Sequence, residues 1–169
     1  MILYHINGGY PAIGPNGRLV SPTLAATPRD AEAEKGKDRY AEFPAPIPGY
    51  LEQVYYHELA ADAQGLVRAG LANESFAGGK GFGFYVSYRA EQLPFFTEWK
   101  MVGQVDYVVG MEPANCHVEG RARERERGTL QFLEPGERRC YELEIGVLED
   151  AGAIQRFRET VERALRAAR

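Results

Sequence analysis

The chain has 169 residues, of which 44% are apolar and 26% are charged, and its formal net charge is −4. This length and composition exclude a disordered chain and fit one domain with a sizeable core. An acidic protein gains little from phosphate backbones or anionic lipid, so nucleic acids and membrane surfaces are poor candidates for partners. The sequence contains no apolar run of membrane-spanning length, and we therefore expect a cytoplasmic protein.

The first part of the chain predicts short strands separated by turns. One strand is expected at Ile2–Ile6, and the chain enters it directly, without a lead-in. A second strand, Arg18–Ser21, follows a turn at 15–17. Residues 22–49 contain five prolines and a charged run, which together favour a long loop. A short helix over Asp30–Lys37 is the one regular element expected within this loop.

Strand patterns return from residue 52 and end in a change of period. The expected strands are Glu52–Leu59, Leu66–Asn73, Gly81–Arg89, Phe95–Val102, Asp106–Glu112 and Cys140–Val147. In residues 151–169, Ile154, Phe157, Val161 and Leu165 recur on one helical face, which predicts an amphipathic helix. Runs of strands closed by one helix favour a mainly β, antiparallel β-sandwich, with residues 1–169 as a single domain.

Several motifs are interpreted without a chemical role. Cys116 and Cys140 lack the spacing of a zinc site or a disulfide framework, so we expect two reduced thiols, although a single bridge stays open. The basic run Arg121–Arg127 contains two glutamates and is interpreted as a solvated loop or strand edge. Residues 78–83 are rich in glycine but lack the spacing of a phosphate-binding loop, which indicates a β-turn. We expect neither a metal nor a cofactor.

Two residues are candidates for proton transfer. Glu112 follows an apolar strand, and a carboxylate that is partly desolvated at a strand end is a better base near neutral pH. His5 lies inside a predicted strand, and its imidazole could donate a proton in the same pH range. The alternatives are an exposed glutamate without a role and a histidine that only makes structural hydrogen bonds.

Four further residues are candidates for binding a ligand. Glu52 and Gln53 combine a carboxylate with an amide, which can bind the neighbouring hydroxyls of a sugar. Adjacent residues of a strand point to opposite faces, so only one of the two need face a ligand. Trp99, followed by Lys100, offers an aromatic face that could stack on a pyranose ring, although a core position is the ordinary role of tryptophan.

The chain resembles the aldose 1-epimerase (galactose mutarotase) superfamily, and in particular a bacterial aldose-1-epimerase-like branch. The segments that carry the resemblance are Leu3–Asn7 with Gly9–Pro11, Thr27–Asp30, Glu52–His57, Thr97–Lys100, Met111–Cys116 and Leu133–Gly136. The resemblance implies a mutarotase-like supersandwich that exchanges the anomers of an aldose or sugar phosphate without metal or cofactor. It also implies that Glu112 is the base and His5 the acid, and it adds Asn7 and Asn115 to the substrate-binding residues.

The chain departs from this superfamily in two ways. Where Glu52-Gln53 stands, the family has an aspartate followed by a histidine, which puts the sugar specificity in doubt. Family members are roughly twice as long, and the resemblance covers only their carboxy-terminal half. We therefore expect a fragment, a truncated reading frame or a half that pairs with another chain, with the exposed N-terminal strand as a site for a homo-oligomer. A carbohydrate-binding protein without catalysis remains the alternative function.

Overall fold

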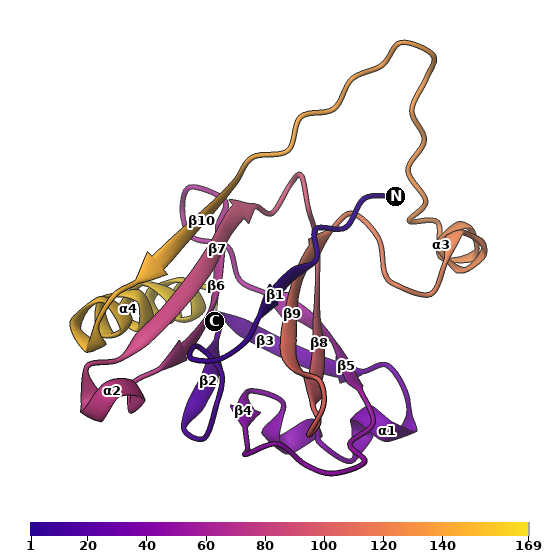
Figure 1. Ribbon diagram of the computed structural model, residues 1–169. Helices are drawn as coiled ribbons and strands as arrows, with labels where there is room; N and C mark the ends of the chain where they lie inside the picture. Colours follow the sequence, from indigo (N-terminus) through magenta and orange to yellow (C-terminus); the bar gives the residue numbers. More distant parts are fainter. Residues whose placement is uncertain (169) are drawn as a thin grey trace.

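The computed structural model describes residues 1–168 and contains two five-stranded antiparallel sheets that pack as a sandwich (Figure 1). Sheet A has the strand order β1-β9-β8-β5-β3 and sheet B the order β10-β7-β6-β2-β4. The strands of sheet A are β1 (Ile6–Gly8), β9 (Tyr107–Ala114), β8 (Phe95–Val102), β5 (Gln53–Leu59) and β3 (Thr23–Pro28). Those of sheet B are β10 (Leu143–Leu148), β7 (Phe82–Arg89), β6 (Leu66–Asn73), β2 (Gly17–Val20) and β4 (Glu42–Phe43). The prediction of a mainly β, antiparallel sandwich is confirmed.

The core lies between the two sheets because apolar residues alternate along the strands. Val67, Ala69 and Leu71 of β6 are buried in one cluster with Val109 and Met111 of β9. Residues at alternate positions of a strand point to the same face, so these side chains form the inner layer. The positions between them point outward, to the two outer faces of the sandwich.

Helix α4 (Ala151–Ala167) covers the outer face of sheet B, as Figure 1 shows. Asp150 caps its first turn by accepting a hydrogen bond from a backbone N–H. Ile154, Phe157 and Val161 are buried against sheet B, and the Phe157 ring stacks on Tyr85 at 5.2 Å between centroids. The amphipathic helix predicted at the carboxy terminus is present, and residue 169 lies outside the described residues.

The expectation of a long loop over residues 22–49 is corrected by the structure. This segment contains β3, α1 (Ala31–Glu34), the 3-10 helix η1 (Lys37–Arg39) and β4. Asp30 starts α1 by accepting hydrogen bonds from two backbone N–H groups, so the short helix expected there is present. Pro28 ends an edge strand, where a residue without an N–H donor is tolerated. The prolines therefore limit these elements in length and do not exclude them.

Two other segments form short helical elements. The basic run expected as a loop or strand edge is helix α3 (Arg121–Arg127), which ends at Gly128 in the left-handed conformation. The glycine-rich turn overlaps α2 (Phe76–Gly79), an irregular turn in which Ala77, Gly78 and Gly79 have positive φ. Residues 129–142 form neither helix nor strand and project from the sandwich before β10 (Figure 1). Both cysteines are unpaired, as expected.

Candidate functional site

The outer face of sheet A brings together several of the polar residues singled out in the sequence. Ile6 pairs with Met111, and this register places His5 beside Glu112 across the β1–β9 boundary. Trp99 pairs with Gly110, so its indole ring lies on the same face one strand further on. Cross-strand partners on one face are neighbours in space, which makes His5, Glu112 and Trp99 one surface.

His5 and Glu112 are in direct contact. The Nδ1 atom of His5 lies 3.2 Å from Oε1 of Glu112, and the imidazole is 43% exposed whereas the carboxyl side chain is only 4% exposed. Burial raises the pKa of Glu112 to about 7, the negative charge of Glu52 acts in the same direction, and the positive charge of Arg29 opposes it. A carboxyl group that gains and loses its proton near neutral pH is suited to act as a base.

A second carboxylate on this face has a different environment. The indole N–H of Trp99 donates to Glu52 at 2.6 Å, and Arg29 donates to the other carboxylate oxygen at 2.9 Å. Arg29 also donates to Asp30 at 2.9 Å. The hydrogen bonds from Trp99 and Arg29 hold the pKa of Glu52 below its usual value. Glu52 therefore stays ionised at pH values where Glu112 exchanges its proton, so the two carboxyls differ in charge near neutral pH.

Gly110 keeps these side chains close together. A Cβ atom added there would lie 2.9 Å from Nε2 of His5, 3.0 Å from Oε1 of Glu112 and 3.3 Å from Cβ of Trp99. The rings of Trp99 and His5 are 5.6 Å apart between centroids, in an edge-to-face arrangement. Asn7, the partner of Gly110 in β1, is exposed on the same face. A glycine inside a strand is one signal of such a close approach.

Gln53 and Lys100 do not join this surface, because each lies one residue away from an outward-facing neighbour. Both are buried on the inner side of sheet A. Gln53 accepts hydrogen bonds from the hydroxyl groups of Tyr50 and Tyr55. The Lys100 ammonium donates to the backbone carbonyls of Arg39 and Tyr40 at 2.8 and 3.1 Å. The two residues predicted to bind substrate therefore face away from His5 and Glu112.

Asn115 also lies apart from the candidate site. Its side chain is buried and accepts a hydrogen bond from the backbone N–H of Ile2 at 2.7 Å. Its amide nitrogen donates to Gln131 at 3.2 Å and to the Tyr141 hydroxyl at 3.1 Å. These contacts fasten the start of the chain and the projecting segment 129–142 to the end of β9. They leave its amide occupied within the protein.

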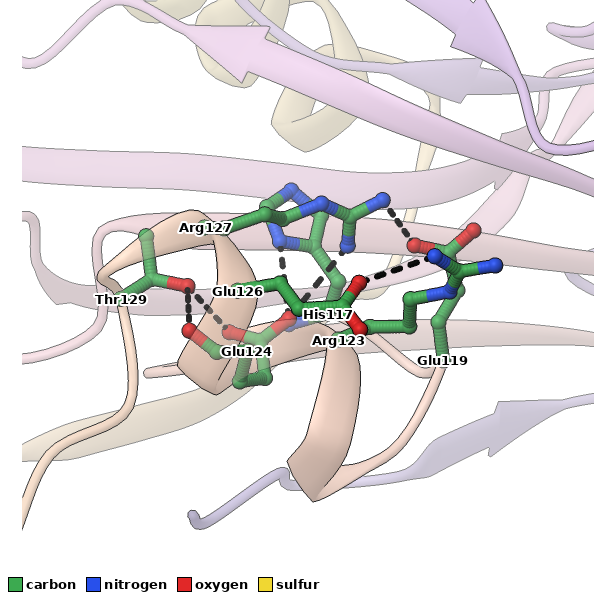
Figure 2. Close-up of polar contacts among 7 residues, drawn as sticks. All are labelled: His117, Glu119, Arg123, Glu124, Glu126, Arg127 and Thr129. Atoms are coloured by element: carbon green, nitrogen blue, oxygen red, sulfur yellow. Dashed lines mark hydrogen bonds and ion pairs between the residues drawn. The ribbon is translucent and has the colours of Figure 1, made fainter.

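A further histidine–glutamate contact lies beyond the end of β9 (Figure 2). Glu124 of α3 is fully buried and accepts hydrogen bonds from the His117 backbone N–H at 3.2 Å and the Thr129 hydroxyl at 2.8 Å. Burial opposes ionisation of Glu124, but these hydrogen bonds outweigh it and keep its pKa below the usual value. Figure 2 shows Arg127 between Glu124 and Glu119, with which it forms ion pairs. This network explains why the basic run folds as a helix.

The polar row on sheet A extends from Glu112 toward His117. In the register, Thr97 pairs with both Glu112 and Tyr56. The His117 ring lies edge-on to the Tyr56 ring, 4.9 Å away between centroids. The hydroxyl groups of Thr97 and Tyr56 are buried without a hydrogen-bond partner among residues 1–168. Buried hydroxyls are nearly always satisfied, so this row has two places for water or a ligand hydroxyl.

Sequence reasoning identified part of this surface and missed the rest. Arg29 lies in a segment that carries the family resemblance, but its contact with Glu52 depends on the pairing of β3 with β5. Gly110 lies within the strand predicted over Asp106–Glu112, and the strand pattern does not show that three side chains pack around it. The sequence alone does not show that Glu124 faces His117.

The candidate site is an open surface. A cavity of about 720 Å³ lies behind it and is lined by Gln53 and Lys100, but not by His5, Glu112 or Trp99. Among residues 1–168, no group of three or more His, Cys, Asp or Glu side chains could hold a metal ion. In the same part of the chain, no helix is long and apolar enough to cross a membrane. The outer face of sheet A is a candidate site because of the polar side chains that it brings together, although it does not form a cavity.

The fold is that of an aldose 1-epimerase-like sandwich. The structure matches, with a TM-score of 0.90, a crystal structure described as that of a "putative aldose 1-epimerase" from Klebsiella pneumoniae. The two chains are 23% identical, and the match covers 96% of this chain and 42% of that chain. The chain thus spans less than half the length of that protein.

By sequence, residues 1–147 match the family described as "Domain of unknown function (DUF4432)", and the chain belongs to this family. No curated protein matches the chain.

Proposed function

We propose that the chain binds an aldose on the outer face of sheet A and that Glu112 and His5 exchange the anomers of this sugar by proton transfer. The observation that carries the proposal is the contact of a buried carboxyl group, with a pKa of about 7, and an exposed imidazole. This pair lies in a fold similar to that of a protein described as a putative aldose 1-epimerase. An acid and a base at the anomeric centre are sufficient for the reaction.

The proposed reaction begins with ionised Glu112 and protonated His5. Glu112 accepts the proton of the anomeric hydroxyl, and His5 donates a proton to the ring oxygen as the bond between this oxygen and the anomeric carbon breaks. The products of this step are the open-chain aldehyde, protonated Glu112 and neutral His5. Rotation about the adjacent carbon–carbon bond and closure on the other face return both protons. The contact between the two side chains allows a proton to pass directly between them.

Trp99, Glu52 and Asn7 are the proposed sugar-binding residues. The Trp99 ring offers an apolar face for the pyranose, and its indole N–H is fixed by Glu52. The carboxylate of Glu52 is about half exposed and has lone pairs left for a sugar hydroxyl. Arg29 acts through Glu52 as a positioning residue, because its guanidinium donates to that carboxylate.

The experiment that tests the reaction is anomer exchange followed by NMR on a panel of free and phosphorylated aldoses. We expect Glu112→Gln to abolish exchange, since an amide cannot accept the anomeric proton. Glu58→Gln is the matched control, because Glu58 is an exposed glutamate of β5 in the same sheet and its side chain forms no hydrogen bond or ion pair among residues 1–168. Exchange retained in Glu112→Gln with the fold intact would contradict the role of Glu112.

A carbohydrate-binding protein without catalysis is the second candidate. It is favoured by the open form of the surface, since the nearby cavity does not include His5, Glu112 or Trp99. It predicts that the chain broadens the sugar resonances without exchanging anomers, and that Trp99→Ala removes this broadening. Binding that is unchanged in Trp99→Ala would count against this candidate and against the proposed role of the indole ring.

A further inference from the structure

The cavity behind the candidate site has the composition of an anion-binding pocket. It is lined by residues of β4 and by residues that follow α1, and it has a volume of about 720 Å³. Its lining contains four cationic side chains, Arg18, Lys35, Arg39 and Lys100, but only one carboxylate, Glu42. This local excess of positive charge stands out in a chain whose net charge is −4. A volume in this range suits a small organic molecule.

Two of the four cations are neutralised within the protein. Arg18 pairs with Glu42 at 3.2 Å, and Lys35 pairs with Glu32 at 2.5 Å. The guanidinium group of Arg39, by contrast, makes no ion pair or hydrogen bond within residues 1–168, although its backbone carbonyl accepts from Lys100. Arg39 is exposed at the rim of the cavity, so its planar donor group is available to a ligand.

Lys100 provides a second cationic group from the wall of the cavity. The residue is only 4% exposed, and its ammonium donates to two backbone carbonyls and lies 5.7 Å from the centre of the Phe43 ring. An ammonium group has three donors, so one remains without an acceptor in the protein. Burial lowers the pKa of Lys100, the negative charges of Glu98 and Glu42 oppose this effect, and the positive charge of Arg39 adds to it. A buried cation of this kind is stabilised by an anion that enters the cavity.

We propose that this cavity binds a small organic molecule through an oxyanion group, a phosphate monoester or a carboxylate, held between Arg39 and Lys100. Tyr50 and Gln53 line the same cavity, and the hydrogen bond from the Tyr50 hydroxyl to Gln53 fixes both side chains in its wall. The site is separate from the outer face of sheet A, because Lys100 and Gln53 point to the inner side. The inference does not rest on the proposed sugar chemistry, and either one can fail without the other.

The test is calorimetric titration of the full chain at pH 7 with glucose 6-phosphate, glucuronate, inorganic phosphate and neutral glucose. We expect the charged compounds to bind in preference to glucose at this cavity. Arg39→Gln should weaken their binding by about tenfold, the effect of losing one charge-assisted contact. Lys37→Gln is the matched control, because Lys37 lies two residues away, loses the same charge and does not line the cavity.

Lys100→Met is a second variant, with its fold checked by circular dichroism, and should also weaken binding of the charged compounds. Glu112→Gln should bind them as the parent chain does, whether or not the parent exchanges anomers. Binding of glucose 6-phosphate alone identifies a phosphate as the ligand group, and binding of glucuronate as well identifies oxyanions in general. Equal affinity in Arg39→Gln and the parent chain overturns the proposal. Binding that is lost in Trp99→Ala but kept in Arg39→Gln also overturns it. The proposal is likewise overturned if none of the charged compounds binds.

Discussion

Glu112 is the residue on which the proposed chemistry depends, and its environment links activity to stability. The side chain is almost completely buried, and burial raises its pKa to about 7. The same burial that prepares a base for neutral pH makes the ionised form of the folded protein costly. Activity and stability should therefore change in opposite directions as Glu112 loses its proton.

The rate of anomer exchange should rise with pH and level off above about 7, because only ionised Glu112 accepts the anomeric proton. The profile can be measured by NMR between pH 5 and 9 with one aldose at a fixed concentration. A rate that is constant over the interval would show that Glu112 is not the group that titrates.

Unfolding should show the opposite trend. The folded pKa of Glu112, about 7, lies above its usual value of 4.5, so the folded state favours the protonated form. The stability that this preference contributes is complete below pH 4.5 and is lost as pH rises to about 7. The loss is at most about 3 to 4 kcal/mol, from about 1.4 kcal/mol per pKa unit.

Glu112→Gln should remove this pH dependence, because glutamine resembles the protonated carboxyl group. At pH 8 we expect the variant to resist urea better than the parent chain, and at pH 4 we expect the two to be alike. Glu58→Gln, at an exposed position, should leave the free energy of unfolding unchanged at both pH values. A variant that is less stable than the parent chain at pH 8 would show that the carboxylate is stabilised by contacts that outweigh its burial.

Part of the candidate site could be predicted from individual residues and their alternation along a strand. The rest depends on contacts between strands, which the sequence does not show. Alternation along a strand correctly separates Glu52 from Gln53, since neighbours point to opposite faces. It cannot show which strand lies beside β8, and so it cannot show that Trp99 donates to Glu52 or that Arg29 reaches the same carboxylate. The positions of Gln53 and Lys100 on the inner face follow from the pairing of β5 with β8.

At the scale of the element, Gly110 of β9 allows His5, Glu112 and Trp99 to pack closely, because it has no side chain. A methyl group at Gly110 would contact His5, Glu112 and Trp99 at 3.3 Å or less. Gly110→Ala should therefore displace these groups and lower the rate of exchange by about 10- to 100-fold, since displacements near 1 Å have effects of this size. The rate is measured by the same NMR experiment.

Gly152→Ala is the control for this substitution. Its added methyl group would meet only the ends of two flexible side chains at the start of α4, at 3.2 and 3.4 Å. It should leave the rate of exchange unchanged. An unchanged rate in Gly110→Ala as well would show that the close packing around this glycine has no part in the reaction.

Most strands were predictable as elements, whereas β3 and β4 within residues 22–49 and the helix at residues 121–127 were not. The strands from β5 to β9 show alternation or dense β-branched and aromatic residues. β3 is an edge strand that ends at Pro28. α3 is held by the contacts of buried Glu124 with His117 and Thr129, which the charge pattern of the sequence does not reveal.

At the scale of the whole molecule, the two sheets share one core and should unfold together. The main cluster contains Leu71 and Val86 of sheet B with Val109 and Met111 of sheet A. Trp99 is the only tryptophan and reports on sheet A, whereas α4, on sheet B, contributes most of the helical circular dichroism. We expect tryptophan fluorescence and the signal at 222 nm to change at the same urea concentration.

Two separate transitions would contradict a shared core. Asp150→Ala serves as a check on the coupling, because it removes the cap of α4 and should lower the free energy of unfolding by about 1 kcal/mol. In a shared core this loss shifts both signals by the same amount, although Asp150 lies far from Trp99 in the sequence. A shift of the 222 nm signal alone would show that α4 unfolds by itself.

The free side of β1 is the proposed site for pairing with a second copy, since β1 is the end strand of sheet A in the order of strands. Analytical ultracentrifugation over a range of concentrations measures the mass of the assembly. A mass of one chain at all concentrations would exclude a homo-oligomer through this edge.

Consecutive residues of β5 and β8 point to opposite faces of sheet A. One side chain therefore lies on the outer surface, and the next lines the inner cavity. Point substitutions can therefore tune the outer surface and the inner cavity independently. A deletion or insertion of one residue in β8 has a different effect, because it exchanges the sides of all following side chains. Trp99 would then point into the sandwich and Lys100 would point outward, so this one change would disrupt both the outer surface and the inner cavity. The side chains on the two faces can change independently, but both faces require that the number of residues in these strands stays the same.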